Sequence, residues 1–354
     1  MGLTFTFPTN VELDVVTQEY IIETDKFIGE QEMPDTEFQT QKVRWDERDS
    51  ERGMTAPHAM DSDPRIDKRP GSKTREYEAI PFKESDLIKE SELLRSRELG
   101  TLGGAINLDR IVTQTARARM DKTKLRAEWC RWQCLGGELE INENGVYVHE
   151  TFPVQTYEVA TSWDNRDEAV PLRDANLVAL KFPGTGASAE GAKEYLNRKM
   201  LNLLLENANP TDIAGFRSEN FRTTTYSLED LNKILATRGL PILVPYDEGW
   251  IDKNGVLQRF IPDGISIVVG KRPANQKVGG FGMTPSLHRT KNGLPAPGYF
   301  NFLEVNGQPN MGSVTVDVAA LGQAANPNIK NTGGVYGGPF LWYARSVVVK
   351  TLLK

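Results

Sequence analysis

The sequence predicts an α+β protein with one long helix, several β-hairpins and an arm that has almost no core of its own. Three observations carry this prediction: helical spacing of apolar residues over 107–135, Asn-Gly and similar turns between short apolar runs, and a charge-dense segment at 41–97. With 354 residues the chain exceeds the usual single-domain size, which predicts two or three lobes. A content of 39% hydrophobic and 25% charged residues is typical of globular proteins.

Composition excludes several classes of protein. A net charge of −6 excludes a generally basic protein that coats nucleic acid by charge alone. Two cysteines cannot build a disulfide framework, and three histidines leave little material for a histidine-rich metal site. Residues 1–30 lack the basic start and apolar run of a signal peptide, and no window approaches the roughly 20 apolar residues of a membrane span. We therefore expect a soluble protein of a reducing compartment, without a membrane partner.

The first part of the chain has two sections. Residues 1–40 mix short apolar pieces with polar spacers, which indicates an extended arm with one or two short elements. Residues 41–97 hold 13 basic and 13 acidic side chains, and Ile66 is the only Ile, Leu or Val between residues 46 and 79. Fixing a residue costs roughly 1–2 kcal/mol of backbone entropy, and this stretch has almost no core to offset that cost.

Two interpretations of the charged segment compete. It is either a disordered loop or a long arm that becomes ordered by lying on neighbouring subunits. The strand-like sequences at its two ends, Val43-Arg44-Trp45 and Tyr77–Phe82, favour a long two-stranded excursion over a flexible linker.

Residues 107–135 read as one long helix. Asn107 is a plausible N-cap, and Gly136-Gly137 ends the helix. At about 1.5 Å per residue the helix would span about 43 Å, which suits a structural strut better than a compact enzyme lobe. Its charges are predominantly basic.

The remaining chain predicts a lobe of alternating α and β character, with a region of short strands and loops over 291–340. The expected elements are a hairpin around Asn144-Gly145, a helix over about 188–207, a helix over about 228–238 opened by Ser227, a strand at 241–245, a hairpin turning at 252–255, a buried strand at 265–269 and a final strand at 346–353 that joins an existing sheet.

Catalytic motifs are weak. Gly186–Lys193 resembles a phosphate loop but lacks the Gly-Lys-Ser/Thr sequence, so we interpret it as a glycine-rich turn into a helix. Cys130 and Cys134 lie on one helical face without a second ligand pair, which favours buried structural cysteines over a zinc site. His58 and His288 are expected at the surface. The sequence therefore predicts a protein that is not an enzyme, with no catalytic residue, cofactor or metal.

The order of the segments resembles the lambda-type major capsid proteins of tailed phages, the phage major capsid protein E family. The cues are Tyr77–Glu84 as the return from an extended loop, Arg119–Leu139 followed by Asn144-Gly145 as strut helix and hairpin, Gly255–Gly264 running into the strand Ile265–Val269, and Tyr336–Phe340 near the C-terminus. The resemblance covers most of the chain in order, although each motif is short and none is catalytic.

The resemblance implies the Hong Kong ninety-seven type of capsid fold. Mapped onto this chain, it predicts an N-terminal arm over 1–40, an extended loop (E-loop) over 41–85, a peripheral domain over 86–162 with a spine helix at 107–135 and a long hairpin, an axial domain over 163–285, and a loop-rich return with the C-terminal strand over 286–354 that completes the peripheral and axial sheets.

The same resemblance implies a subunit that self-assembles into the hexamers and pentamers of an icosahedral head around double-stranded DNA. Portal, scaffold and decoration proteins would be further partners, and the location would be the virion, after assembly in the host cytoplasm. Contacts with adjacent subunits are expected from ten charged E-loop residues: Arg44, Asp46, Arg48, Arg52, Asp61, Asp63, Arg65, Asp67, Lys68 and Arg69. A non-viral compartment shell with this fold, or a nucleotide-dependent enzyme using Gly186–Lys193, are the alternatives.

Overall fold

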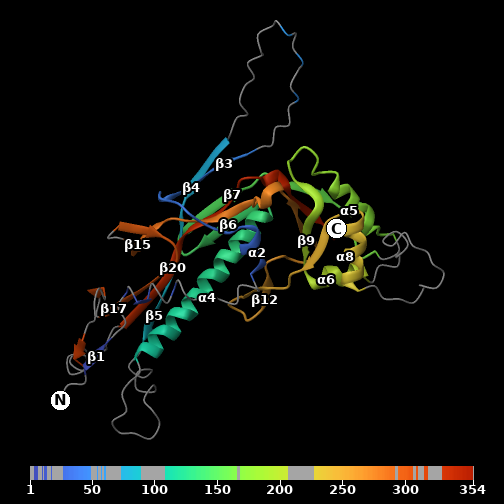
Figure 1. The fold of residues 1–354 in the computed structure, drawn as a ribbon. Helices are drawn as coiled ribbons and strands as arrows, with labels where there is room; N and C mark the ends of the chain where they lie inside the picture. Colours follow the sequence, from blue (N-terminus) through green and yellow to red (C-terminus); the bar gives the residue numbers. More distant parts are fainter. Residues whose placement is uncertain are drawn as a thin grey trace.

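Two lobes meet at one end of a long helix, α4 (Leu108–Leu135) (Figure 1). The computed structural model describes residues 4–6, 10, 12–13, 17, 27–48, 54, 57, 60, 73–88, 108–165, 168–205, 227–291, 294–305, 308–309, 315–317 and 329–353. One lobe contains a six-stranded sheet and α4, and the other contains a five-stranded sheet with, among its described residues, three short helices. The predicted α+β class is confirmed, and so is the helix over 107–135, although its expected N-cap Asn107 lies outside the described residues.

The six-stranded sheet is organised around one long strand, β20 (Ile329–Leu341). The other members are β2 (Asp35–Glu37), β5 (Ile80–Ile88), β14 (Gly279–Met283), β17 (Phe300–Val305) and β18 (Gln308–Pro309). The first part of β20 pairs antiparallel with β17 on one side and with β5 on the other, and its last part pairs antiparallel with β14. The expectation of short strands over 291–340 is therefore wrong for β20, whose 13 residues form the longest strand of the described chain.

Glycines explain why β20 does not look like a strand in the sequence. A Cβ on Gly333 would lie 2.8 Å from the Cβ of Arg119 on α4, and one on Gly334 would overlap the carbonyl oxygen of Phe82. These glycines therefore allow α4 and the neighbouring strand to approach closely, rather than marking a loop. Arg119 reinforces this contact through ion pairs with Glu84 and Asp86 of β5.

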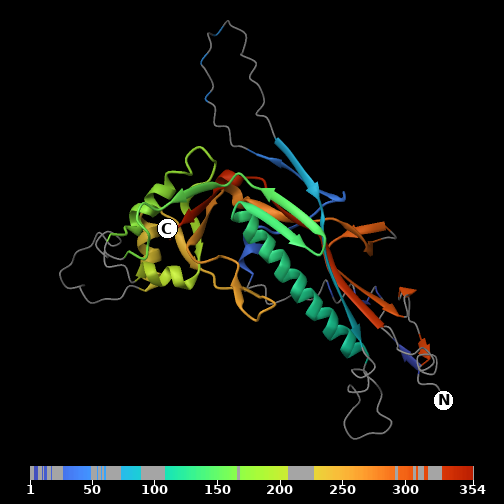
Figure 2. The same cartoon turned by 180° about the vertical axis from the view of Figure 1, so that it is seen from behind.

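The five-stranded sheet is assembled from distant parts of the chain. Its order is β10 (Ile242–Pro245), β9 (Ser188–Leu196), β13 (Ile265–Lys271), β21 (Val347–Thr351) and β8 (Gln155–Glu158). The C-terminal strand β21 pairs antiparallel with β13 and parallel with β8, which confirms that the final strand joins a sheet formed by earlier segments. A second core, rich in leucine, lies in this lobe (Figure 2). Three helices contribute side chains to it: α5 (Pro171–Ala179), α6 (Arg198–Leu205) and α8 (Leu228–Thr237).

The predicted helix over 188–207 is wrong in its first half. Residues 188–196 form β9, and only 198–205 are helical, as α6. Ala, Glu and Lys are good helix formers, but here pairing with β10 and β13 prevails over local propensity. Gly191 has a φ of +75°, which a helix does not accommodate.

Local turn chemistry is predicted well. Asn144 and Gly145 both have positive φ in the hairpin of β6 (Glu138–Glu143) and β7 (Val146–Thr151), as a two-residue type I′ turn requires. The predicted hairpin at 252–255 is also confirmed, between β11 (Gly249–Ile251) and β12 (Leu257–Arg259).

Ser227 caps α8, because its hydroxyl oxygen accepts a hydrogen bond of 3.2 Å from the backbone N–H of Asp230. We expect Ser227→Ala to lower the free energy of unfolding of the unassembled subunit by about 1 kcal/mol, since the first turn loses an acceptor. Urea denaturation followed by circular dichroism measures this change. Ser227→Asp keeps a capping oxygen and serves as the control, so an equal loss in both variants would contradict the capping role.

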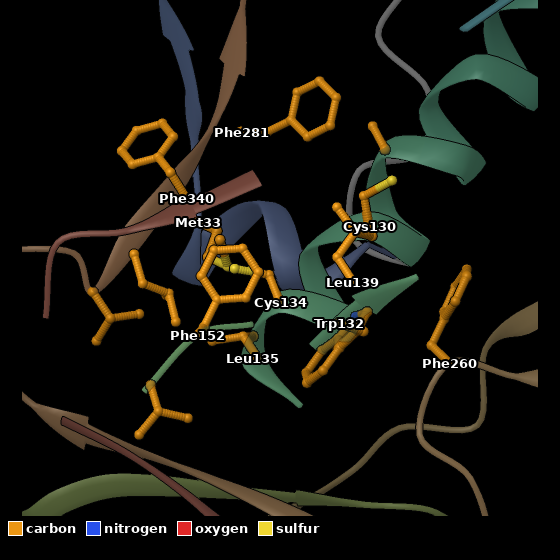
Figure 3. Packing of buried hydrophobic residues seen from close by; sticks show 14 of the residues in the cluster. Met33, Cys130, Trp132, Cys134, Leu135, Leu139, Phe152, Phe260, Phe281 and Phe340 are labelled. Carbon is orange, nitrogen blue, oxygen red and sulfur yellow. The ribbon is translucent and has the colours of Figure 1, made fainter. Parts of the chain in front are cut away.

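The main core lies where the C-terminal end of α4 meets both lobes (Figure 3). Trp132 and Leu135 of α4 pack there in one cluster with Phe281 and Phe340 of the six-stranded sheet. The same cluster includes Tyr195 of the five-stranded sheet. The two lobes therefore share a continuous core and form one interlocked subunit.

A segment near the N-terminus takes part in this core. Helix α2 (Ile28–Glu32) lies beside α4, and β2 pairs parallel with β14. Met33, between the two elements, is completely buried. The expected short elements within 1–40 are thus present, and they belong to the body of the subunit.

Candidate assembly surface

A two-stranded hairpin formed by residues of the charge-dense segment 41–97 projects from the six-stranded lobe (Figure 1). It consists of β3 (Lys42–Glu47) and β4 (Lys73–Glu78), paired in register from Lys42–Glu78 to Glu47–Lys73. The strand-like sequences expected at both ends are confirmed. The pairing holds the two ends of the intervening residues at neighbouring positions.

The inner face of the hairpin is fixed to the core by aromatic side chains. Trp45 is 4% exposed, and its ring centroid lies 5.7 Å from that of Tyr77 in an edge-on arrangement and 6.2 Å from that of Phe340. The Tyr77 hydroxyl donates a 2.6 Å hydrogen bond to the carbonyl oxygen of Pro339 on β20. A Cβ on Gly338 would overlap this hydroxyl, so glycine is needed there.

The outer face of the hairpin carries charge, because side chains alternate between the two faces of a strand. Lys42 Nζ lies 2.8 Å from Glu76 Oε1 on the facing strand. This hydrogen bond raises the pKa of Lys42 and lowers the pKa of Glu76. Thr74 on the same face donates a 2.7 Å hydrogen bond to Asp46. The ion pair of Arg75 and Glu47, at 2.9 Å, lies instead on the inner face, where Arg75 is directly opposite Trp45. Strand pairing is thus accompanied by cross-strand polar pairs, which leave charged groups facing outward.

The ten predicted contact residues divide into two groups. Arg44, Asp46 and Arg48 are all exposed, and the backbone N–H of Arg48 donates a 2.8 Å hydrogen bond to the carbonyl oxygen of Trp342. The other seven lie outside the described residues: Arg52, Asp61, Asp63, Arg65, Asp67, Lys68 and Arg69. The role of all ten in subunit contacts stays a prediction.

We expect Trp45→Ala to destabilise the unassembled subunit by about 3–5 kcal/mol, because it empties an aromatic site in the core. The Trp45→Phe variant keeps a ring against Tyr77 and Phe340 and should lose clearly less. Urea denaturation monitored by near-UV circular dichroism measures both. Equal losses in the two variants would show that the ring contacts do not hold the hairpin.

A buried polar network joins α4 to both lobes, and it was not predicted. Glu128 of α4 is completely buried, pairs with Arg131 at 3.4 Å and accepts three further hydrogen bonds. The donors are the backbone N–H of Gly29 on α2 at 2.7 Å, Trp132 Nε1 at 2.8 Å and the Tyr246 hydroxyl at 2.9 Å. Burial, aided by the Glu128 charge, raises the pKa of Tyr246 well above its usual value, so this hydroxyl keeps its proton and remains a donor.

Helix α2 and the loop after it supply the rest of the network. Arg131, 2% exposed, forms an ion pair with Asp35 and donates a 2.9 Å hydrogen bond to the carbonyl oxygen of Met33. Glu32 accepts hydrogen bonds from Lys193 at 2.8 Å and from the Tyr195 hydroxyl at 2.7 Å, both on β9. α2 therefore connects α4 to the five-stranded sheet through charged and hydroxyl groups.

The sequence does contain a signal for this network. Glu128 and Arg131 interrupt the apolar stripe of α4, close to Ala127, Cys130 and Cys134. A charge inside an apolar stripe requires a partner, because an unpaired buried charge is very unfavourable. Glu128 and Arg131 also contact each other, and Trp132 is four residues from Glu128, but the other partners lie 96 to 118 residues away in the sequence, so the pattern alone does not identify them.

Residues 186–193 do not form a phosphate loop. Residues 188–193 are the first part of strand β9, whereas the phosphate-binding loop leads into a helix N-terminus, so the expected turn into a helix is wrong. Lys193 of this segment pairs with Glu32. His288 was expected at the surface and is half-buried instead, with its ring 5.1 Å from that of Phe300, and burial lowers its pKa. His58 lies outside the described residues.

Cys130 and Cys134 are both free and buried, as expected for structural cysteines. Within the described ranges there is no group of three or more side chains that could hold a metal ion. Nor does any helix of the described chain have the length and apolar character needed to cross a membrane.

Burial raises the pKa of Cys130 to about 12, so its thiol stays protonated and covered at neutral pH. We expect a thiol reagent to detect neither cysteine in the folded protein and both after unfolding in urea. Unfolding frees a thiol with a pKa of about 8.5, so only the unfolded state loses a proton just above that pH. Stability should therefore fall as the pH rises from about 9 towards 12. Rapid labelling of the folded chain at neutral pH would contradict this assignment.

A strut helix, a projecting charged hairpin and two lobes fused through one core define the class of shell-forming capsid proteins with the Hong Kong ninety-seven type of fold. The chain belongs to the phage major capsid protein E family, whose model matches residues 11–321. It is thus a major capsid protein of the tailed-phage type and a structural component of the virion, and the resemblance read from the sequence is confirmed. No curated protein matches the chain.

Two solved structures show the same fold at low sequence identity. A putative capsid protein of a prophage from Escherichia coli CFT073 is 13% identical, with a TM-score of 0.59, and the match covers 98% of this chain and 99% of that one. A phage-related protein from Bordetella bronchiseptica RB50 is also 13% identical, with a TM-score of 0.52, and the match covers 97% of both chains.

Proposed function

We propose that this chain assembles into hexamers and pentamers of an icosahedral head that encloses double-stranded DNA. In this proposal, residues 41–85 form the E-loop, and its ten charged residues contact adjacent subunits. The observation that carries the proposal is the hairpin of β3 and β4. Its inner face is anchored in the core through Trp45, while its outer face presents Arg44 and Asp46 to the surroundings.

The charge pattern supports contacts between copies of the same chain. The segment 41–97 holds equal numbers of acidic and basic residues, so two copies can place opposite charges against each other without net repulsion. A lone exposed ion pair contributes little to stability. In a closed ring each subunit contacts one neighbour on each side through two different surfaces. The same small contact is therefore repeated around the ring, and its contributions add up.

We propose the remaining assignments by analogy with the family. Residues 1–40 would be the N-terminal arm, with α2 and β2 packed onto the body of the subunit, 86–162 the peripheral domain, 163–285 the axial domain and 286–354 the return with the C-terminal strand. Portal, scaffold and decoration proteins would be partners during and after assembly in the host cytoplasm. DNA would lie close to the shell without sequence-specific contacts, in keeping with the net charge of −6.

Electron microscopy of the purified, assembled protein tests the proposal. We expect closed icosahedral particles built from rings of six and five subunits. Particles isolated from phage-producing cells should contain nuclease-resistant double-stranded DNA. Particles that enclose a cargo protein and no DNA would identify a compartment shell instead, and failure to form any closed particle would contradict assembly.

A further inference from the structure

A second hairpin displays an unusual density of exposed apolar side chains. It consists of β11 and β12 and projects on the opposite side of the subunit from the hairpin of β3 and β4 (Figures 1 and 2). Ile251 is 72% exposed, and Val256 and Leu257 are each 53% exposed. Within the described part of the chain, no other stretch of seven residues contains three large hydrophobic side chains this exposed.

Two of these side chains form an apolar edge, and the third is its neighbour in the chain. Ile251 and Leu257 are directly paired across the two strands, so their side chains are close neighbours on the same face. Val256 directly precedes Leu257 at the turn. A contiguous exposed apolar edge, in contrast to scattered single residues, is typical of a protein contact.

The tip of the hairpin is held in one conformation. Asp252 accepts hydrogen bonds from the backbone N–H groups of Asn254 at 2.8 Å and Val256 at 2.9 Å, and Gln258 donates a third to it at 3.1 Å. Gly255 adopts a φ of +79° within this turn. The apolar edge is therefore displayed by a rigid turn, and little conformational entropy is lost when it binds.

The base of the hairpin is fixed to the core. Trp250 stacks on Phe260 with ring centroids 6.0 Å apart, and it meets Trp129 of α4 edge-on at 6.1 Å. Phe260 is almost completely buried and stacks in turn on Tyr246. A side chain at position 249 would overlap the backbone of Gln258, so Gly249 allows the backbones of the two paired strands to lie close together. Aromatic packing thus sets the direction in which the apolar edge points.

We propose that the edge formed by Ile251, Val256 and Leu257 packs against a second copy of this chain within the shell. This inference rests on the proposed function. Residues 249–258 carry one acidic and one basic side chain, so the hairpin offers no net positive charge for nucleic-acid phosphates. A subunit in a closed ring needs two dissimilar contact surfaces. The charged hairpin and this apolar edge are dissimilar and lie on opposite sides of the molecule.

Protection of a single thiol tests the proposal directly. Both native cysteines are buried, so Val256→Cys introduces a thiol that a maleimide reaches in the folded subunit. We expect this thiol to react in unassembled subunits, to lose its reactivity in particles formed by the purified chain alone, and to react again after those particles are dissolved in urea. Equal labelling of particles and free subunits would overturn the proposal, and protection that requires an added scaffold or decoration protein would also overturn it.

A second variant tests whether assembly needs the edge. Ile251→Ser combined with Leu257→Ser should leave the melting temperature of the subunit unchanged, because both side chains are exposed, and should abolish closed particles. Leu180→Ser is the matched control, since it removes a leucine that is 72% exposed at the C-terminal end of α5, and it should still form particles. Normal particles from the double variant, or equal loss in the control, would overturn the proposal. A wild-type chain that forms no shell would instead contradict the proposed function.

Discussion

A subunit in which residues 50–71 are replaced by a single glycine is expected to fold normally and to form no closed shells. The deletion leaves β3 and β4 intact, because β3 ends at Glu47 and β4 begins at Lys73. The remaining loop of Arg48, Asp49, the new glycine and Ser72 is long enough to close a hairpin. The aromatic anchor of Trp45 and Tyr77 is unaffected. The proposed contacts of the deleted charges with neighbouring subunits would all be lost.

Three measurements on the same sample test this expectation. Circular dichroism and thermal melting should match the wild-type subunit, sedimentation velocity should show single subunits or isolated rings, and electron micrographs should show no closed particles. A full-length variant with Ser at the seven charged positions 52, 61, 63, 65, 67, 68 and 69 separates charge from length. If charge carries the contacts, this variant should also fail to close. Normal particles from the deleted chain would contradict the role of the segment in assembly.

Local signals explain which parts of this fold are readable from the sequence. The helix over 107–135, the Asn144-Gly145 hairpin and the Ser227 cap depend on residues within a few positions of one another. Helical spacing, positive φ and a capping hydroxyl act at short range, so the sequence pattern carries them in full. The same holds for strands β3 and β4, in which the apolar residues Val43, Trp45 and Tyr77 alternate with charged ones and face the core.

Long-range pairing explains the errors. Glycines in β20 indicate a loop when they are considered locally, yet they are required because Arg119 and the backbone of β5 approach so closely. Residues 188–196 contain helix-forming side chains, but β10 and β13 recruit them into a sheet. In both cases tertiary contacts outweigh local propensities that amount to less than about 1 kcal/mol per residue.

The candidate assembly surface is predictable only in outline. Neutral charge density and the lack of apolar residues identify the segment, but they do not identify the residue of a neighbouring subunit that each charge meets. The apolar edge at Ile251 and Leu257 was similarly hidden, because an apolar pair flanking a turn is expected to face inward. Its exposure depends on Trp250 and Phe260, which fix the base of the hairpin.

Replacing Glu128 by alanine is expected to cost about 3–5 kcal/mol of subunit stability, a large fraction of the total for a typical domain. The variant leaves the N–H groups of Gly29 and Trp132 and the hydroxyl of Tyr246 buried without their acceptor. It also deprives the buried Arg131 guanidinium of one of its two carboxylate partners. Each unsatisfied buried donor costs about 1–3 kcal/mol, although relaxation prevents the costs from adding in full.

Glu128→Gln separates charge from shape in the same position. It keeps an acceptor oxygen, so it should lose less stability than Glu128→Ala in urea denaturation of the unassembled subunit. Glu229→Ala is the matched control, because it removes a carboxylate that is 80% exposed and forms only an i,i+4 pair with Lys233. The urea midpoint of this control should stay close to that of the wild type.

Limited proteolysis adds a local measurement. The backbone N–H of Gly29 links α2 to Glu128 on α4, so loss of this carboxylate should loosen α2. Cleavage within residues 27–38 should therefore accelerate in Glu128→Ala alone. A Glu128→Ala subunit as stable as the Glu229→Ala control would mean that packing, and not this carboxylate, holds α2 and the two lobes together.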